Sequence, residues 1–536
     1  MQRFILFPGD IHMVKVAEAT GDLEAIIART ALKYDLLPYE SKPFAQSQPA
    51  RLGALARLFG LEAAPMENAR VLELGCASGG NIIPHAALYP NATFVGVDLA
   101  RTQVAAGRAR IERMGLDNVE ILCKSFTEIG EELGAFDYII CHGVYSWVPP
   151  QVQDAIMRVV RARLSPVGVA CISYNVHPGW RMMQPLRDAL QLGVPDSVDS
   201  LGRVAIAREM LTFLSANSPD KGPYGDTLRN WAGRLATLPD DYIAHEFLEE
   251  CNAPCLLTDF TGSAARHGLG YLGECELSGM IIDNYGSELA AGIRARGGND
   301  LVASEQWLDL LTGRTFRQTL LIANERMGGV NRNLTPQAME NLHLVLPVGA
   351  SFQRDGDKAG FTYADGRSIN TEVGAVAAMM EVMAKRYPAT TCLAELLGDG
   401  DATASEQIRE TAYRMAMTGL VHLNSEPVVC ATQAGDMPKA IAVARADAKA
   451  GITTTTSLRH ETVALDAAAQ VLLPYLDGKT GHKALEAHLQ EASKLGKLSY
   501  ARSGQPITDP KELKTTISEH LPALLAGIAA TALLEP

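Results

Sequence analysis

Glycine and acidic residues in the first fifth of the chain are spaced as they are in nucleotide-binding turns. The segment ELGCASGG, residues 73–80, follows the apolar residues Val71 and Leu72 and precedes residues 81–84. This order predicts a buried strand, a glycine-rich turn and the start of a helix. Glycine lets the backbone adopt positive φ and approach a ligand closely, and a helix N-terminus offers free N–H groups. We therefore expect a nucleotide to bind at this turn.

Two kinds of nucleotide fit the turn. Gly75, Ala77 and Gly79 occupy the positions of the G-x-G-x-G pattern of an S-adenosylmethionine site, and Gly75, Ala77 and Gly80 those of the G-x-G-x-x-G dinucleotide pattern. Alanine breaks both patterns. Asp98 ends the second predicted strand, where a carboxylate can accept hydrogen bonds from both ribose hydroxyls, and it favours an adenosine ligand of either kind.

Alternating strands and helices must position these residues. Helices are predicted over residues 102–114 and 151–164, and the second has one apolar stripe. The alternation predicts a parallel sheet whose strand ends line the ligand site. Two features favour a methyl donor over a nicotinamide. One is Glu73, which lies two places before the first glycine, and the other is the pair formed by the fourth and fifth predicted strands. The predicted strands are residues 70–72, 93–97, 119–122, 136–141 and 167–175.

The chain resembles the class I S-adenosylmethionine-dependent methyltransferases. Within them it is most similar to the bacterial subgroup with a methyltransferase regulatory domain, which includes the rickettsial outer-membrane-protein lysine methyltransferases. Six blocks in order indicate a likeness of the whole architecture, and Ala77 departs from the family, which more often has glycine there. The blocks are Tyr34–Leu52 (YDLLPYESKPFAQSQPARL), Val71–Pro84 (VLELGCASGGNIIP), Cys141–Pro149 (CHGVYSWVP), Ile172–Trp180 (ISYNVHPGW), His267–Glu274 (HGLGYLGE) and Leu472–Gly478 (LLPYLDG).

The resemblance implies an α/β fold with a Rossmann-like seven-stranded methyltransferase sheet, and residues 269–273 and 317–322 are candidates for its last two strands. The helical insertion, about residues 180–245, is expected either to form a homodimer contact, as in the resembled family, or to act as a lid. The expected domains are a lead-in and cofactor-covering segment (1–48, helical over 14–32), a cofactor domain with the insertion (49–325), a small β-rich module (326–375) and a mainly helical, winged-helix-like C-terminal domain (376–536).

The cofactor expected from the resemblance is S-adenosyl-L-methionine, with S-adenosyl-L-homocysteine as product and no metal. The glycine-rich turn should contact its methionine and ribose portions, chiefly through backbone atoms. Asp98 should hold the ribose, although it could instead only cap the following helix. The predicted cofactor-binding residues are Gln46, Glu73, Gly75, Cys76, Ala77, Gly79, Asp98, Leu99, Ser125, Phe126, His142 and Gly143.

Four residues just past the fourth and fifth strands are candidates for catalysis. Methyl transfer from a sulfonium is an in-line displacement, so the site must align the reacting atoms and exclude water. A lysine nucleophile must also lose its proton. Tyr145 and Trp147 could form an aromatic slot for an amine, and Tyr174 and Asn175 could orient it or accept its proton. Alternatively, Trp147 only covers the core and Asn175 caps the next helix.

The charge, cysteine content and apolar runs of the sequence limit the classes of partner and the cellular location that we expect. A net charge of −13 without a basic cluster argues against a nucleic-acid partner, and nine scattered cysteines predict reduced thiols in a cytoplasmic protein. No signal peptide is expected, and the longest apolar run, residues 521–534, is too short for a transmembrane segment, so it is expected to be a core helix. Three functions stay open: a lysine methyltransferase with a protein or peptide substrate, a small-molecule methyltransferase, and a non-catalytic S-adenosylmethionine-binding protein.

Overall fold

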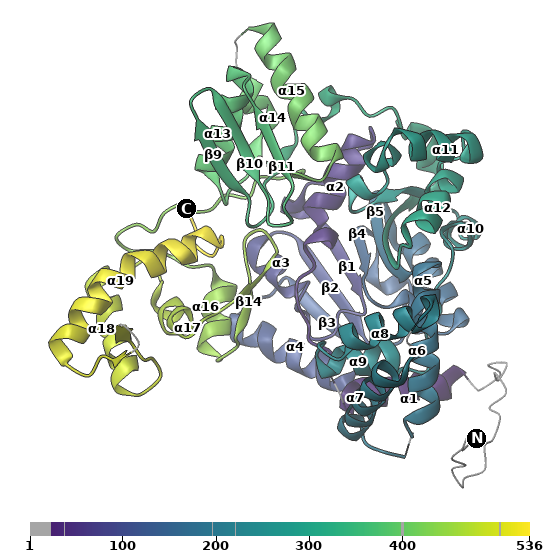
Figure 1. The fold of residues 1–536 in the computed structure, drawn as a ribbon, viewed down its shortest axis with the longest axis horizontal. Coiled ribbons are helices and arrows are strands. Elements are labelled where there is room, and N and C mark those ends of the chain that lie inside the picture. Colours follow the sequence, from purple (N-terminus) through teal and green to yellow (C-terminus); the bar gives the residue numbers. More distant parts are fainter. Residues whose placement is uncertain (1–22, 37, 196, 220, 398–400, 503–504) are drawn as a thin grey trace.

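A seven-stranded sheet forms the centre of the molecule (Figure 1). The computed structural model describes residues 23–536 except residues 37, 196, 220, 398–400 and 503–504. The strands are β1 Arg70–Leu74, β2 Thr93–Asp98, β3 Val119–Cys123, β4 Phe136–Cys141, β5 Leu164–Asn175, β6 Leu269–Glu274 and β7 Phe316–Ala323. Their order in the sheet is β3-β2-β1-β4-β5-β7-β6. All seven predicted strands, including the two late candidates, are therefore present.

Strand β7 runs in the opposite direction to the other six strands. The first five strands pair parallel, but β7 runs antiparallel to both of its neighbours, β5 and β6. Two helices, α11 (Ser287–Gly297) and α12 (Leu301–Thr312), separate β6 from β7 and pack against each other. Because a pair of antiparallel helices returns the chain to the edge that it left, β7 begins at the carboxyl edge of the sheet. The parallel pairing predicted from the alternation of the first five strands is confirmed, and the direction of β7 makes the complete sheet mixed.

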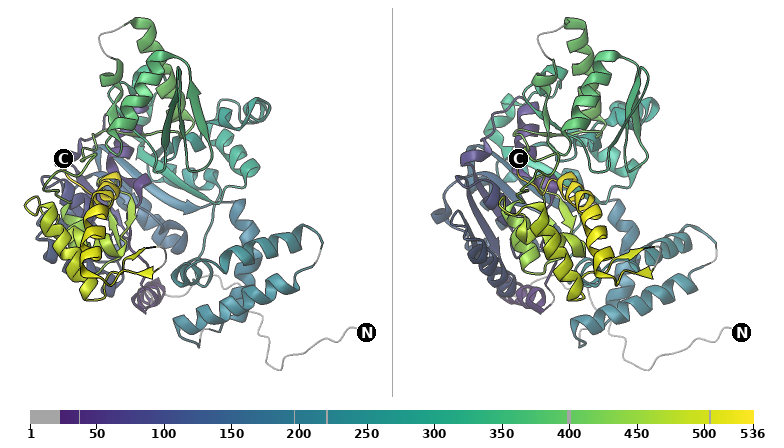
Figure 2. Two further views of the ribbon diagram at one scale, coloured as in Figure 1. Left: turned by 60° about the vertical axis from the view of Figure 1, so that its left-hand side comes forward. Right: turned by 90° about the vertical axis from the view of Figure 1, so that its left-hand side faces the viewer.

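Helices flank the sheet, and the insertion projects from it (Figure 2). The insertion has its own buried cluster, in which Leu186, Leu211 and Ile243 are inaccessible to solvent. Of the helix predicted over residues 14–32, the part before residue 23 lies outside the described residues. The helices are α1 Leu23–Leu36, α3 Ile83–Leu88, α4 Arg101–Met114, α5 Pro150–Arg163, α10 Leu257–Arg266 and, in the insertion, α6 Gly179–Gly193, α7 Ser200–Asn217, α8 Pro223–Leu235 and α9 Asp240–Phe247.

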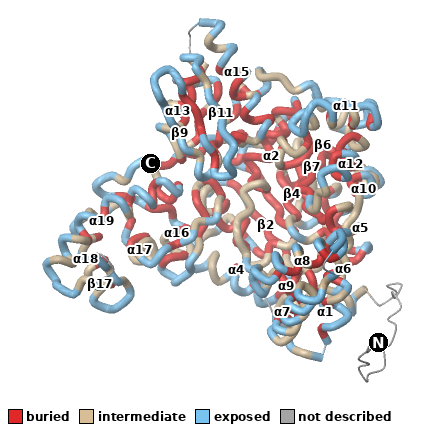
Figure 3. The backbone as a smooth tube through the Cα atoms, viewed as in Figure 1, coloured by how far each residue is buried: buried red, intermediate tan, exposed pale blue. Residues whose placement is uncertain are grey.

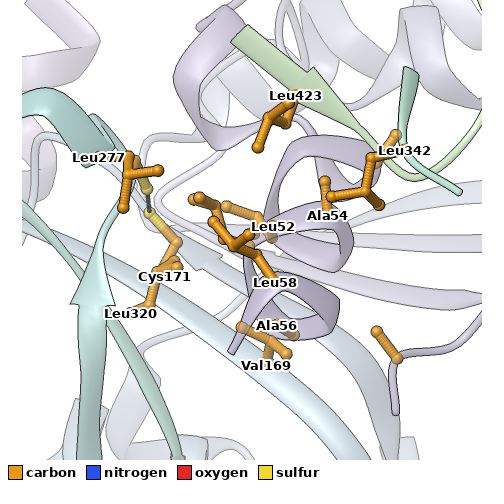
Figure 4. Close-up of a cluster of buried hydrophobic side chains, with 14 of the residues drawn as sticks. Leu52, Ala54, Ala56, Leu58, Val169, Cys171, Leu277, Leu320, Leu342 and Leu423 are labelled. Carbon is orange, nitrogen blue, oxygen red and sulfur yellow. Dashed lines mark hydrogen bonds between the residues drawn. The ribbon is translucent and has the colours of Figure 1, made fainter. Parts of the chain in front are cut away.

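Helix α2 (Pro49–Leu58) joins the sheet to a middle module. Every residue of α2 except Arg57 is buried, as expected for a helix that is covered on all sides. Figure 4 shows Ala56 of α2 beside Val169 of β5, and Ala54 beside Leu342 of the middle module. The module comprises β8 His343–Val345, β9 Ser351–Asp355, β10 Lys358–Thr362, β11 Ser368–Thr371, α13 Gly374–Arg386, β12 Thr391–Cys392, α14 Leu393–Leu397, α15 Ala402–Met417 and β13 His422–Asn424.

Strand pairing extends this β-rich middle module beyond its expected end at residue 375, because β8 pairs with both β12 and β13.

A C-terminal module with its own buried core follows, and Figure 3 shows exposed helix surfaces around that core. The elements are α16 Ala442–Lys449, β14 Thr454–Thr456, β15 Thr462–Ala464, α17 Ala467–Leu472, α18 His482–Lys494, β16 Ala501–Arg502, β17 Gln505–Pro506 and α19 Pro510–Ala530.

Candidate functional site

A cavity of about 390 Å³ opens at the carboxyl ends of β1, β2, β4 and β5. Its other walls include α1, the segment of residues 39–44, the residues after β3, helices α4, α5, α6 and α9, and the start of β7. Twelve predicted site residues line it: Glu73, Gly75, Cys76, Ala77, Asp98, Leu99, Ser125, Phe126, His142, Gly143, Trp147 and Asn175. Gln46, Gly79, Tyr145 and Tyr174 do not line it. The fold thus brings most of the predicted residues to one place.

The turn after β1 requires glycine at its first position. Gly75 has φ +78°, and a Cβ atom there would lie 2.3 Å from Cγ2 of Val144. Gly79 also has positive φ, and its N–H donates to the carbonyl of Cys76 at 2.8 Å. These conformations hold backbone atoms of the turn against the cavity, in the manner expected for a nucleotide-binding turn.

Ala77 adopts the left-handed conformation that glycine usually takes. Its φ is +48°, and its N–H donates to Oδ2 of Asp98 at 2.8 Å. A residue with a Cβ atom is strained in this region by about 1–2 kcal/mol. The alanine therefore keeps the shape of the turn, at a cost in backbone strain.

Asp98 faces the cavity from the end of β2. Its second carboxylate oxygen accepts from the N–H of Ala100 at 2.9 Å, although Ala100, not Asp98, is the N-cap residue of α4. Burial raises the pKa of Asp98, and the N–H groups of Ala100 and Ala77 oppose that rise. Each carboxylate oxygen has one backbone donor and can accept a second hydrogen bond, so the group is free to bind a diol.

Glu73 is a buried carboxyl group with one oxygen unused. Oε1 accepts from Nδ2 of Asn81 at 2.8 Å, whereas Oε2 has no hydrogen-bond partner. Burial raises the pKa of Glu73 to about 8, and the hydrogen bond from Asn81 opposes the rise. An unpaired buried carboxyl is costly, so a ligand that donates to Oε2 would be bound favourably.

His142 is held neutral at the end of β4. Its ring lies 3.9 Å from the ring of Phe44, and its Nδ1 atom is 3.4 Å from Nε2 of Gln318. Burial, together with the smaller effect of the nearby Lys42 ammonium, lowers the pKa of His142 to about 4. Next to it, Gly143 has φ +69° and donates its N–H to Oγ of Ser173 at 2.7 Å.

The four candidate catalytic residues divide into two pairs. Trp147 and Asn175 line the cavity. Tyr174 instead stacks on Phe260 at 3.8 Å and shares a 2.9 Å hydrogen bond with Thr319, and Tyr145 packs edge-on against Phe260. Both tyrosines are 4% exposed or less. The aromatic slot expected from Tyr145 is therefore not formed by that residue, which belongs to the core beneath the cavity.

Sequence reasoning missed the residues that α1, α9 and β7 contribute. Tyr34 of α1 stacks on His245 of α9 at 4.8 Å. Glu246 of α9 lines the cavity, and burial raises its pKa to about 7, against the influence of Arg187. For Tyr34 at the end of α1, the only indication was the resemblance, which places residues 34–48 over the cofactor. The residues missed altogether include Tyr242, His245, Glu246 and Phe316, whereas Tyr34, Tyr39, Lys42 and Phe44 belong to the segment that was expected to cover the cofactor but were not named as site residues.

The described part of the chain forms neither a metal-binding cluster nor a membrane-spanning helix. No group of three or more His, Cys, Asp and Glu side chains among those residues is arranged to hold a metal ion. None of the helices formed by residues with assigned structure is both long and apolar enough to cross a membrane.

Three family models match separate parts of the chain. Residues 71–168 match a methyltransferase domain, residues 239–323 a predicted methyltransferase regulatory domain, and residues 436–533 the PKMT C-terminal winged helix domain. The first match contains the turn after β1 and Asp98. The second runs from α9 to the end of β7, and so contains Glu246 and Phe316.

Relatives match nearly the whole chain. It is 32% identical over 533 residues to the uncharacterized protein RP789 of Rickettsia prowazekii, covering 94% of this chain and 93% of the relative. It is 35% identical over 236 residues to RP028 of the same organism, 44% of this chain and 94% of that protein. Structures of PKMT2 from Rickettsia typhi, alone and in complex with AdoHcy, superpose with a TM-score of 0.83 at 26% identity, covering 93% of this chain and 100% of theirs.

Proposed function

The chain belongs to the class I S-adenosylmethionine-dependent methyltransferases that carry a methyltransferase regulatory domain, and from this membership we propose that it methylates lysine side chains of a protein substrate. Its cofactor is S-adenosylmethionine. The observation that carries the proposal is the composition of the cavity. One continuous space contains the cofactor residues and, beyond them, the aromatic residues Trp147 and Tyr242 with the carboxyl group of Glu246.

The residues around the turn fit the cofactor. Bound S-adenosylmethionine supplies a methyl group on a positively charged sulfur, which departs as a neutral thioether. Asp98 would hold the ribose hydroxyls, since both of its oxygens can accept further hydrogen bonds. Oε2 of Glu73, which has no partner, would accept from the amino group of the methionine portion. His142 is neutral above pH 5 and so adds no positive charge beside the sulfonium.

The rest of the cavity fits a lysine side chain. An aromatic wall lined by Trp147 and Tyr242 favours an aliphatic chain that ends in a cation. Lysine must arrive as an ammonium and react as a neutral amine, so a proton has to leave Nζ. With its pKa near 7, the Glu246 carboxylate can attract the ammonium and accept that proton. Alignment of Nζ, methyl carbon and sulfur then provides most of the catalysis.

The relative named PKMT2 supports this substrate class, because its name denotes a protein lysine methyltransferase and the superposition extends over its whole chain. We also propose that the insertion forms a homodimer contact. Three large apolar side chains of the insertion, Leu192 of α6 with Leu201 and Phe213 of α7, are 87%, 66% and 64% exposed and are available for such a contact. Light scattering of the purified protein would test this, and a monomer at every concentration would contradict it.

The substrate proposal is tested by following the methyl group. Purified protein is incubated with S-adenosylmethionine that carries a radioactive methyl group and with a cell extract, and the label is divided into protein and small-molecule fractions. We expect label in protein, and much less with Glu246→Gln, which keeps the size of the side chain but cannot take up a proton. A parallel binding measurement should show that Glu246→Gln still binds S-adenosylhomocysteine. Label in the small-molecule fraction alone would refute a protein substrate.

A further inference from the structure

Residues 457–461 of the C-terminal module, which connect β14 to β15, contact Asn81, a residue that lines the cofactor cavity. Ser457 builds this turn: its backbone N–H donates to the carbonyl of Glu461 at 2.9 Å, and its hydroxyl accepts from the N–H groups of Arg459 and Glu461. The turn presents His460, which has φ +58° and is inaccessible to solvent. A buried histidine in the left-handed region is uncommon, and it indicates that the surroundings hold it there.

His460 is hydrogen-bonded to the network behind the glycine-rich turn. Its Nε2 atom lies 2.8 Å from Oδ1 of Asn81. That oxygen also accepts from the N–H of Phe44 at 2.8 Å, while Nδ2 of Asn81 donates to Oε1 of Glu73 at 2.8 Å. Because Oδ1 can only accept, His460 carries its proton on Nε2. One amide thus joins the C-terminal module, the lead-in segment and the carboxyl group that faces the cavity.

The turn is anchored on both sides. Arg459 donates to the carbonyls of Pro388 and Leu346 in the middle module. Next to the turn, Asp447 of α16 accepts from Arg110 of α4 at 2.8 Å, in an ion pair that is largely buried. Figure 1 shows α16 and β14 next to α3 and α4, in agreement with their packing contacts. The position of His460 therefore depends on the docking of the C-terminal module on the cofactor domain.

We propose that His460 is a positioning residue for cofactor binding, and that the C-terminal module supports the cofactor site through the turn of residues 457–461. His460 orients the amide of Asn81, and Asn81 in turn holds Oε1 of Glu73, a residue that lines the cavity. The affinity for the cofactor consequently depends on the docking of the C-terminal module. This inference concerns the cofactor alone and does not rest on a lysine substrate.

His85 offers a matched control. Its ring stacks on that of His460 at a centroid distance of 3.7 Å and is 1% exposed, but neither of its nitrogen atoms has a hydrogen-bond partner. Phenylalanine at either position keeps a flat ring in the stack. Only at position 460 does this substitution remove a hydrogen bond to the network, so the pair of variants separates packing from positioning.

The experiment measures binding of S-adenosylhomocysteine to the full-length protein by titration calorimetry. We expect His460→Phe to weaken binding about tenfold and His85→Phe to change it by less than about twofold. His460→Gln, whose amide can reach Asn81, should restore most of the affinity, and His460→Asn, whose amide is one methylene shorter, should not. The two amide variants keep the test valid if His460→Phe fails to fold. Wild-type affinity in His460→Phe or His460→Asn, or an equal loss in His85→Phe, would overturn the proposal.

Discussion

Replacing Glu73 with glutamine should remove most of the pH dependence of cofactor binding. The carboxyl is buried, one of its oxygens has no partner, and its pKa is raised to about 8. Only the ionised form attracts the ammonium group of the methionine portion. With that pKa, about 3% of the protein is ionised at pH 6.5 and about three quarters at pH 8.5, so the apparent affinity of the wild type should rise by up to about 25-fold.

The assay is titration calorimetry with S-adenosylhomocysteine at both pH values. The amino group of the ligand titrates as well, but it does so equally with the wild type and the variant. Glutamine at position 73 retains an oxygen that accepts from Asn81, so Glu73→Gln should keep the local structure and show a nearly flat profile after this common contribution is subtracted. In buffers of different ionisation enthalpy, the wild type should release a proton on binding at pH 7. An unchanged pH profile in Glu73→Gln would refute the reasoning.

The same carboxyl group affects the stability of the ligand-free protein, and the sign is fixed by its raised pKa. The folded protein keeps a proton on Glu73 that the unfolded chain loses above its ordinary value of 4.5. The contribution to stability is therefore complete below pH 4.5 and is lost as the pH rises toward about 8. Denaturant unfolding should show a steeper decline over this range in the wild type than in Glu73→Gln. Parallel curves for the two proteins would count against the raised pKa.

Three further substitutions test the turn and the ribose acceptor. Gly75→Ala should destabilise the protein by about 1–3 kcal/mol in thermal unfolding and weaken S-adenosylhomocysteine binding, because its Cβ atom would lie 2.3 Å from Val144 in a left-handed backbone; wild-type behaviour would show that the turn is not constrained. Ala77→Gly should raise the free energy of unfolding by about 0.5–1 kcal/mol, since it relieves strain at φ +48°; a loss of stability would be the opposite of what the strain implies. Asp98→Ala should weaken S-adenosylhomocysteine binding about 100-fold in calorimetry, since charged acceptors contribute strongly; an unchanged affinity would exclude Asp98 as the ribose ligand.

The local sequence pattern was sufficient to predict the strands of the sheet and many of the residues that line the cavity. Short apolar runs marked the strands, and their ends had to meet at one edge because the chain alternates between strand and helix. That reasoning predicted that Glu73, Asp98 and His142 lie at the same edge of the sheet. It gave no direction for β7, where a pair of helices in place of one reverses the strand.

Side-chain direction past a strand end could not be predicted in the same way. Residues 145–147 form a 3-10 turn, in which successive side chains point about 120° apart, so Trp147 reaches the cavity while Tyr145 enters the core. In β5 the alternation of faces sends Asn175 to the cavity and Tyr174 away from it. Without the register of these residues, proximity to a strand end does not distinguish a site residue from a core residue.

Some residues at or near the site come from distant segments, and the sequence around them does not indicate a functional role. Glu246 lies within an ordinary amphipathic helix, and His460 lies in a short turn more than 350 residues after Asn81 in the sequence. Their roles depend on how modules dock, which is decided by long-range contacts such as the ion pair of Arg110 and Asp447. These residues could be found only in the folded chain.

The identity of the amino acid that receives the methyl group tests the proposed function most directly. Protein labelled by the enzyme with radioactive S-adenosylmethionine would be hydrolysed in acid, and its amino acids separated against methylated standards. The account predicts that the label elutes with methylated lysine, and that Asp98→Ala yields little of it because the cofactor is bound weakly. Label on another amino acid, or none in protein while the enzyme still binds S-adenosylmethionine, would contradict the proposal that it methylates protein lysines.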